Sequence, residues 1–437
     1  MCLYSQAEYE QLYHINTRVH NSDNNGCVSF LLTSQGDKTQ TENQAGFELI
    51  SFLTSCAESI SSGDHASINY FMARLGESAS PSGQTPTHRL AAYFTEALSL
   101  RAASQWPLTF SLNLPRDLAD PVEQEEDAVA FRLLDQATPI PKFIHFTLNQ
   151  RMMRAFEGMD RVHIIDLDIR FGLQWPSLFQ SLASRQHPPS HVRITGVGGS
   201  KLELQRTGAR LSAIADSLNL PFQFHAVVDQ LEDVRLWMLH VKEGECVAVN
   251  AAFQLHRTLY DEAGGALKDL LGVIHSANPK IFLLAEEEGE NNQFRWEKRF
   301  AESLKYYSAI FDALDSSLPE NGSERMKIEK TFGRKIRNII AAEGAERFER
   351  HESFGKWRRM MEDGGFRIVG IGEEEVIQGE VILRMYSDYA SYSLEKKGED
   401  GGGLCLKWRE QELYTVSAWA PNPVEAAGLR SAESQRV

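Results

Sequence analysis

The chain has 437 residues, a length that allows either one large α/β unit with an addition or two to three smaller domains. Its 42% hydrophobic and 24% charged residues are typical of a folded globular protein and exclude a collagenous or low-complexity chain. Lysine and arginine number 45 against 60 acidic residues, giving a net charge of −15. This charge argues against a surface that contacts nucleic acid on all sides, but it permits a local basic patch.

The cysteines and the N-terminal residues indicate the cellular setting. Cys2, Cys27, Cys56, Cys246 and Cys405 are odd in number, far apart and without a CxxC pair, so we expect neither a disulfide framework nor a zinc site. The start of the chain lacks the basic and apolar segments of a signal peptide, and no stretch approaches the roughly 20 apolar residues of a membrane helix. We therefore expect a reduced compartment and no membrane.

Residues 1–43 are polar and show no sustained hydrophobic period, so we expect a disordered tail. From Phe47 onward, apolar residues recur at the three- and four-residue spacing of helices. Pro139 and Pro141 separate two later helical segments. The pattern predicts an all-helical region over residues 44–158.

After this region, strands alternate with helices. The predicted strands cover residues 162–169, 191–198, 222–228, 246–253, 280–287 and 366–372. The predicted helices cover residues 176–183, 202–218, 231–240, 265–276, much of 294–363, and 373–386. Such alternation predicts a parallel sheet with helices on both faces, and the strands at 392–397, 404–408 and 413–419 predict an antiparallel end.

The loop after the first strand is where an open α/β sheet would bind a ligand. This loop contains Asp166 and Asp168 but only one glycine, Gly172, whereas a nucleotide-binding loop usually needs two or three. The second strand ends in Gly196–Ser200, without the acid that grips ribose. The pattern disfavours a small-molecule cofactor, and we expect both aspartates to hydrogen-bond the loop and the helix start.

The first strand also begins a motif that several later blocks accompany. The motif VHIID consists of Val162, His163, Ile164, Ile165 and Asp166 and continues as LDIRFGLQWPSLFQSLA. The accompanying blocks are residues 139–150, 207–224, 247–259, 303–315, 333–352, 357–366, 406–408 and 417–419. In this order, from about Phe47 to Pro421, the chain resembles the GRAS family of plant transcriptional regulators, most closely a scarecrow-like member.

The resemblance implies a fold similar to that of S-adenosylmethionine methyltransferases, a Rossmann-like mixed sheet with an N-terminal helical cap. It implies a GRAS domain over residues 44–421. Within this domain the cap and first leucine-rich block would lie in 44–158, and the α/β core would occupy 159–421. We expect residues 422–437 to form a second disordered tail.

The leucine-rich blocks are the family's usual partner surfaces and correspond to residues 47–105 and 202–260. The candidate partner-binding residues in them are Leu49, Leu53, Ile60, Leu204, Leu211 and Leu218. Stripes of this kind also pack the core of a fold, so both roles are considered.

The segment 325–359 is the one clear charge anomaly. It holds eleven basic and five acidic residues, a net +6 that leaves −21 for the rest of the chain. The candidate DNA-contact residues are Arg325, Lys327, Lys330, Arg334, Lys335 and Arg337. Such residues could meet phosphates in a salt-sensitive DNA contact, or they could pair with acids of the chain itself.

The terminal block that resembles the SAW motif is expected to be structural. Its residues are Trp357, Trp408, Ser417, Ala418 and Trp419. The tryptophans lie among alternating apolar residues and should pack in the core.

The histidines and the remaining acids indicate no metal site and no catalytic site. His163 lies within a parallel strand and is expected to be a core residue, and His256 and His351 lack metal-ligand spacing. Glu286, Glu287 and Glu288 favour a solvated acidic loop over a cation site. We therefore expect no metal ligand and no catalytic residue.

The sequence favours a regulator of transcription that acts in the nucleus and uses no cofactor. A second location in the cytoplasm is compatible with this hypothesis. The partners implied by the resemblance are other GRAS proteins, as homo- or heterodimers, and DNA-binding transcription factors, with DNA itself as a further ligand. One alternative is an S-adenosylmethionine-dependent methyltransferase, since fold alone does not set function. The other is a direct, sequence-specific DNA-binding factor, for which the −21 remainder is unfavourable.

Overall fold

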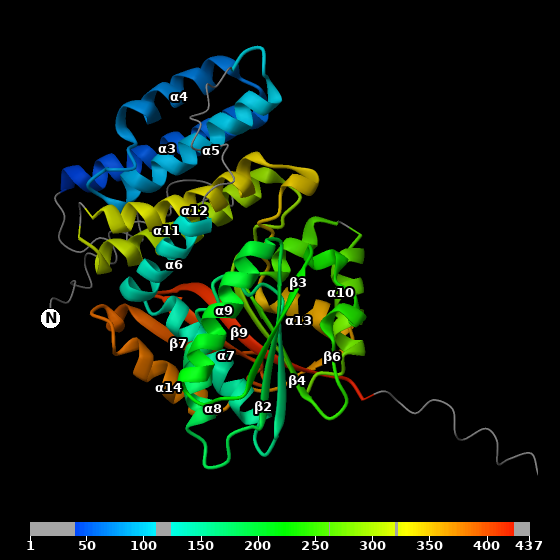
Figure 1. The fold of residues 1–437 in the computed structure, drawn as a ribbon. Helices are drawn as coiled ribbons and strands as arrows, with labels where there is room; N and C mark the ends of the chain where they lie inside the picture. The colour runs from blue at the N-terminus through cyan, green and yellow to red at the C-terminus, as the bar shows by residue number, and fades with distance from the viewer. Residues whose placement is uncertain (1–39, 111–123, 262, 320–321, 424–437) are drawn as a thin grey trace, which may run out of the picture.

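A computed structural model describes residues 40–110, 124–261, 263–319 and 322–423. The two expected tails lie almost entirely outside these residues, except that the first described helix already begins at Gln40. The described chain forms a helical cap above an α/β core (Figure 1). No helix in these ranges combines the length and the apolar composition needed to span a membrane.

The cap is assembled from two distant parts of the sequence (Figure 1). Its helices are α3 (Gln40–Ser62), α4 (His65–Ser78), α5 (Pro86–Gln105), α6 (Gln124–Ala137), α11 (Trp296–Ser317) and α12 (Ser323–Ala341). Helix α5 contacts α3, α11 and α12, and α6 contacts α12. The cap therefore extends beyond residues 44–158, because two helices that follow the parallel strands complete it.

Buried contacts hold the two parts of the cap together. The guanidinium of Arg89 in α5 is fully buried and forms ion pairs with Asp315 of α11, at 2.7 Å, and with Glu329 of α12, at 2.8 Å. In α12, a Cβ at Gly333 would lie 2.3 Å from the Tyr93 ring of α5. A glycine costs about 1 kcal/mol in a helix interior, and here it allows the two helices to approach closely.

The core is a nine-stranded mixed sheet with the strand order β3-β2-β1-β4-β5-β9-β8-β7, and β6 pairs with β9. The strands are β1 (Arg161–Asp166), β2 (His191–Gly198), β3 (Phe222–Val228), β4 (Cys246–Ala252), β5 (Ile281–Glu287), β6 (Phe366–Ile368), β7 (Tyr392–Lys397), β8 (Gly403–Trp408) and β9 (Gln411–Pro421). Strands β1 to β5 are mutually parallel, whereas β6 to β9 pair antiparallel. The expected Rossmann-like mixed sheet is confirmed.

Helices cover both faces of the sheet. They are α7 (Ile140–Ala155), α8 (Trp175–Ala183), α9 (Lys201–Ser217), α10 (Gly265–Ser276), α13 (Phe354–Asp363) and α14 (Glu373–Leu383). Alternate strand residues enter two apolar clusters: Ile164 packs with α7, α8, α9 and the cap, and Ile165 packs with α10 and α13. Helix α7 therefore belongs to the core, although its sequence continues the cap region.

The predicted elements differ most from the observed ones at residues 231–240 and 366–372, and the segments predicted at 162–169 and 373–386 each end three residues early. Residues 231–240 form two 3₁₀ turns, η2 (Leu231–Asp233) and η3 (Leu236–Leu239), because Val234 and Arg235 between them are extended. A 3₁₀ turn repeats every three residues, so the apolar spacing did not distinguish it from an α-helix. The strand predicted at 366–372 is shorter, since pairing ends at Ile368. The other 3₁₀ turns are η4 (Leu255–Tyr260), η5 (Gly344–Glu346) and η6 (Tyr389–Ser391).

The SAW block is buried as expected. Its three tryptophans, Trp357, Trp408 and Trp419, are at most 2% exposed, and Ser417 and Ala418 are equally covered. The indole N–H of Trp419 donates to Ser417 Oγ at 3.0 Å, and that of Trp408 donates to Asp312 at 2.8 Å. The block packs β8, β9 and α13 into the core.

Candidate functional site

A cavity of about 350 Å³ lies between the cap and the carboxyl ends of β1 and β4. Adjacent parallel strands that lead away in opposite directions create a crevice at this point, and such crevices are where open α/β sheets bind ligands. Helices α6 and α12 of the cap and α7 of the core close the cavity. It is therefore the first place to look for bound chemistry.

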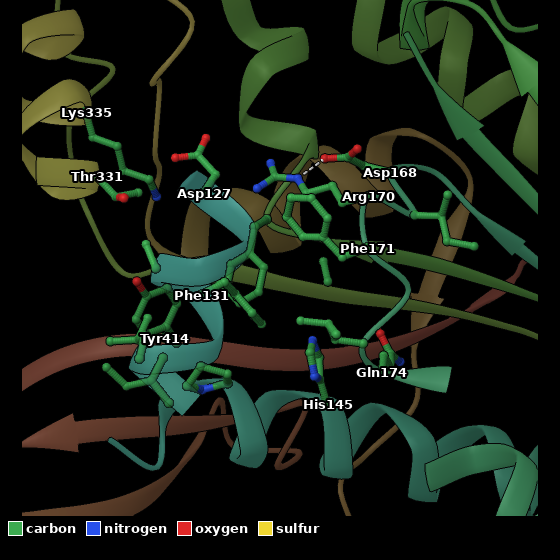
Figure 2. Close-up of a pocket in the computed structure, with 18 of the residues that line it drawn as sticks. Asp127, Phe131, His145, Asp168, Arg170, Phe171, Gln174, Thr331, Lys335 and Tyr414 are labelled. Atoms are coloured by element: carbon green, nitrogen blue, oxygen red, sulfur yellow. Dashed lines mark hydrogen bonds and ion pairs between the residues drawn. The ribbon is translucent and has the colours of Figure 1, made fainter. Parts of the chain in front are cut away.

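The cavity has a charged side and an apolar middle (Figure 2). Asp127, Asp168, Arg170 and Lys335 lie along one side, and the rings of Phe131 and Phe171 lie below them. The charges on this side are paired: Arg170 with Asp168 at 2.5 Å, Arg334 with Asp127, and Lys335 with buried Glu287. An incoming ligand would have to compete with these pairs.

The polar floor is satisfied by its own side chains. Asp166 accepts from Asn250 Nδ2 at 3.3 Å and from the indole N–H of Trp175 at 3.0 Å. Gln174 donates to the side-chain oxygens of Asn250 and Asn149. Burial raises the pKa of the Asp166 carboxyl to about 7. The floor is a closed hydrogen-bond network.

The loop after β1 packs closely on α9 and on the end of β2. Asp166 accepts from the backbone N–H of Asp168, as expected for a loop-stabilising aspartate. The Thr207 hydroxyl of α9 donates to the carbonyl of Arg170 at 2.8 Å, which draws the loop onto α9. A Cβ at Gly196 would lie 2.8 Å from Ile169, so the isoleucine side chain covers the end of β2. These residues do not fit S-adenosylmethionine.

His163 of the VHIID motif is a core residue, as predicted. It is fully buried, and its Nε2 lies 2.8 Å from the Thr195 hydroxyl. Burial and the neighbouring Arg193 guanidinium lower the pKa of the imidazole to about 3. The motif's apolar residues Val162, Ile164 and Ile165 are also fully buried, so the motif holds the centre of the sheet.

The leucine-rich candidates require a correction. Leu49, Leu53, Ile60, Leu204 and Leu211 are at most 2% exposed and belong to the main apolar cluster, and Leu218 is half-buried against it. Because their side chains already pack within the cap or between α9 and the sheet, a partner could contact them only by opening the fold. They serve the core rather than the surface.

The basic candidates are also used within the chain. Arg325 is buried beside Asp315 and Glu329. Among the six basic candidates, Lys327 is the one whose side chain is classed as exposed. The remaining pairs are Lys330 with Glu126, Arg334 with Asp127, Lys335 with Glu287, and Arg337 with Glu96. Five of the six candidate cations are therefore paired with acids of the chain itself.

The acids at the end of β5 are not a solvated loop. Glu286 and Glu287 are at most 3% exposed, and they lie beside His256 and His351. Burial opposes a charge on His256, but Glu286 and Glu349 outweigh it and raise the pKa of the imidazole. The sequence expectation was wrong because the partners of these acids come from distant segments.

An exposed apolar surface also escaped the sequence analysis. On α14, Ile377 and Val381 are 54–58% exposed, and their spacing of four places them on one helix face. Met385 and Tyr389, which follow the end of the helix, are 65% and 50% exposed. That spacing was visible in the sequence, but a periodic apolar stripe does not reveal which of two faces the fold covers.

The sheet topology and the helices above it define a capped Rossmann-like protein. The profile of the GRAS domain family matches residues 49–420. The chain therefore belongs to the GRAS family, whose members are plant transcriptional regulators.

Similar proteins agree with this assignment. The chain is 56% identical over 397 residues to Protein DWARF AND LOW-TILLERING of Oryza sativa subsp. japonica, covering 89% of this chain and 64% of that protein. It is 54% identical to Scarecrow-like protein 28 of Arabidopsis thaliana, covering 88% of this chain and 60% of that protein. The chain thus spans less than two thirds of the length of these curated relatives.

A solved structure supports the fold. The crystal structure of SCL7 in Oryza sativa has a TM-score of 0.73 and 30% sequence identity, covering 85% of this chain and 99% of that one. The similarity extends over both the cap and the core.

Proposed function

We propose that this chain regulates transcription in the nucleus as a protein-interaction scaffold and not as an enzyme. Its partners would be other GRAS proteins or DNA-binding transcription factors. Family membership supports the regulatory part of the proposal. The surface of α14 supports the scaffold part and is the observation on which the proposal depends.

The α14 stripe consists of Ile377, Val381, Met385 and Tyr389. Single exposed apolar residues are ordinary, but four of them within residues 377–389, on α14 and the turns after it, are the kind of residues that partners bury. The opposite face of α14 packs against α7 and β7, so the helix is held rigidly. A rigid helix face with apolar anchors is a common recognition surface for proteins.

Charges around the stripe can set specificity. Glu373 pairs with Lys396 of β7, Glu374 pairs with Arg154 of α7, and Arg384 lies 3.8 Å from Glu380. Such exposed pairs contribute little to stability and can be exchanged for pairs with a partner. An apolar centre with a charged rim is typical of specific protein interfaces.

The cavity argues against the enzyme alternative. Ile169 covers the end of β2, and the floor groups Asp166, Gln174 and Asn250 bond one another. A calorimetric titration with S-adenosylmethionine should show no saturable binding. Tight binding that disappears in Asp166→Ala would contradict the proposal and favour a methyltransferase.

The scaffold proposal is tested by recovering partners. The tagged chain is purified from plant tissue and compared with Ile377→Glu/Val381→Glu, which places two charges on the stripe. The control is Trp237→Glu, because Trp237 is 72% exposed on η3, at the opposite edge of the sheet. Loss of partners only in the α14 variant supports the proposal, and their retention in that variant contradicts it.

The recovered partner then separates indirect from direct action on DNA. A mobility-shift assay over a range of salt concentrations compares the chain alone, the partner alone and the complex. We expect the partner to bind DNA and the chain alone not to, because most cations of α12 are already paired. Salt-sensitive, sequence-specific binding by the chain alone would favour the direct DNA-binding alternative.

A further inference from the structure

A buried group of imidazoles and carboxylates lies next to the cavity, where the ends of β4 and β5 meet the segment before α13. His256 lies in η4, Glu286 lies at the end of β5, and His351 follows η5. These three side chains are 0–3% exposed. One ligand atom from each lies within 4.8 Å of the other two, close enough to surround a single ion after small side-chain adjustments.

A fourth side chain joins the group. Glu349 Oε2 lies 2.8 Å from His351 Nε2 and 3.3 Å from His256 Nε2. On the other side of its ring, His256 Nδ1 lies 2.8 Å from Glu286 Oε2. The two imidazole rings stack with centroids 4.1 Å apart, and each presents a nitrogen to Glu349.

Three buried atoms of the group lack a hydrogen-bond partner among the described residues. They are Nε2 of His256, Nδ1 of His351 and Oε2 of Glu287, and the last of these lies 3.4 Å from His351 Nε2. A buried polar atom without a partner costs about 1–3 kcal/mol. Unpaired imidazole nitrogen and carboxylate oxygen are the atoms that transition metals bind.

The charges of the group also favour a cation. Three buried carboxylates, Glu286, Glu287 and Glu349, face two fixed positive charges in contact with them, Lys335 and Arg257. With neutral imidazoles the group would hold one negative charge in excess, which either a proton on His256 or a bound cation offsets. A divalent ion ligated by two histidines would offset this excess, and imidazole with carboxylate is a donor set that zinc accepts.

We infer that the chain binds one divalent transition-metal ion of the zinc type through His256, His351 and Glu286, with the fourth position left to water. The ion joins η4, the end of β5 and the segment between α12 and α13. This inference is independent of the proposed scaffold function.

The test uses the full chain after removal of metal with a chelator. Isothermal titration with zinc chloride should show one equivalent bound, with a dissociation constant of about 1 µM or lower. Bound zinc should raise the melting temperature, because it binds the folded chain preferentially. Cobalt(II) in place of zinc should give the visible bands of four-coordinate nitrogen and oxygen ligation without a near-ultraviolet thiolate band.

Matched variants locate the ion. His351→Gln and Glu286→Gln should each weaken zinc binding at least about 100-fold, by comparison with the 10–100-fold loss typical of outer-shell changes. His225→Gln is the control, because His225 and His240 form another stacked pair at 4.2 Å that lacks such a carboxylate set. It should bind zinc like the unaltered chain.

Several results would overturn the inference. They are the absence of stoichiometric binding by the unaltered chain, a thiolate band with cobalt, or equal loss in His225→Gln. Unchanged affinity in both ligand variants would do the same. Circular dichroism checks the fold of each variant, and if a variant does not fold, the cobalt spectrum of the unaltered chain still decides.

Discussion

Trp419 of the SAW block lies near the C-terminal end of β9, between Phe282 of β5 and Ile368 of β6. Its indole is fully buried, so Trp419→Ala leaves a large cavity and removes the N–H···O bond to Ser417. We expect the free energy of unfolding to fall by about 3–5 kcal/mol, measured by urea denaturation. In contrast, Trp237→Ala at an exposed position should change it by less than about 0.5 kcal/mol.

Asp166 gives the core a pH dependence that can be isolated. Its pKa is about 7 in the folded chain against an ordinary value of 3.8, so the folded state binds more protons between about pH 4 and 7. The contribution of this carboxyl to stability therefore decreases as pH rises through that window and is constant above it. Each unit by which the pKa is raised corresponds to about 1.4 kcal/mol.

The difference in free energy of unfolding between the unaltered chain and Asp166→Asn isolates this carboxyl, because the pH dependence of all other groups cancels in it. Urea denaturation at pH 5, 6, 7 and 8 should show the stability of the unaltered chain falling relative to the variant, by roughly 3–4 kcal/mol in total from pH 4 upward. A difference that stays flat, or that grows in favour of the unaltered chain as pH rises, would show that Asp166 is not held protonated.

At the scale of residues, the sequence predicted what depends on local pattern. His163 lies in an apolar strand, and this position alone indicated burial, as did the alternation around Trp408 and Trp419. Burial of Glu286 could not be predicted in the same way. Its partners His256 and Glu349 are brought to it only by the fold, and an acid without visible partners is expected in solvent.

At the scale of elements, an ion pair from Lys335 connects helix α12 of the cap to the sheet. Lys335 forms an ion pair with Glu287 of β5, which is 1% exposed. Lys335→Met would leave that carboxylate without its strongest fixed cation, so we expect a loss of about 3 kcal/mol. This is the low end for breaking a buried pair, because the Lys335 side chain is itself 21% exposed.

The matched control lies on the same helix. Lys327 is exposed, and Lys327→Met changes the same charge without uncovering a buried acid. It should alter the free energy of unfolding by less than about 0.5 kcal/mol in the same denaturation assay. Equal effects of the two substitutions would mean that net charge, and not the contact with Glu287, explains the loss.

Element boundaries followed from the sequence where one periodicity dominated. The predicted strands at 191–198 and 222–228 coincide with β2 and β3, and the helix at 265–276 coincides with α10. The α-helix predicted at 231–240 was wrong because three- and four-residue spacings of apolar residues overlap over so short a length. The exposed face of α14 was not predicted for another reason, since packing decides which apolar face of a helix is buried.

At the scale of the whole molecule, the order of elements was predictable but their grouping was not. A helical region followed by an α/β region is visible in the sequence, and the structure has both. Assignment of α11 and α12 to the cap required knowing that their apolar faces meet α5, more than 180 residues away in the sequence. Contacts of such separation leave no local signal.

This grouping predicts that the cap cannot be shortened from its N-terminal side. A chain that begins at residue 124 would lack α3, α4 and α5, and would uncover buried residues of α11 and α12, among them Phe300, Phe311 and Ile336. It would also leave Glu329 without the Arg89 guanidinium that neutralises it.

We expect this shorter chain to self-associate and to bind a hydrophobic dye such as ANS, because a large contiguous apolar surface would face solvent. Size-exclusion chromatography and dye fluorescence, with the full chain as reference, measure both effects. A monomer that excludes the dye and unfolds in one cooperative transition would mean that α11 and α12 are stable on the core without the first helices, and that the cap is two independent parts.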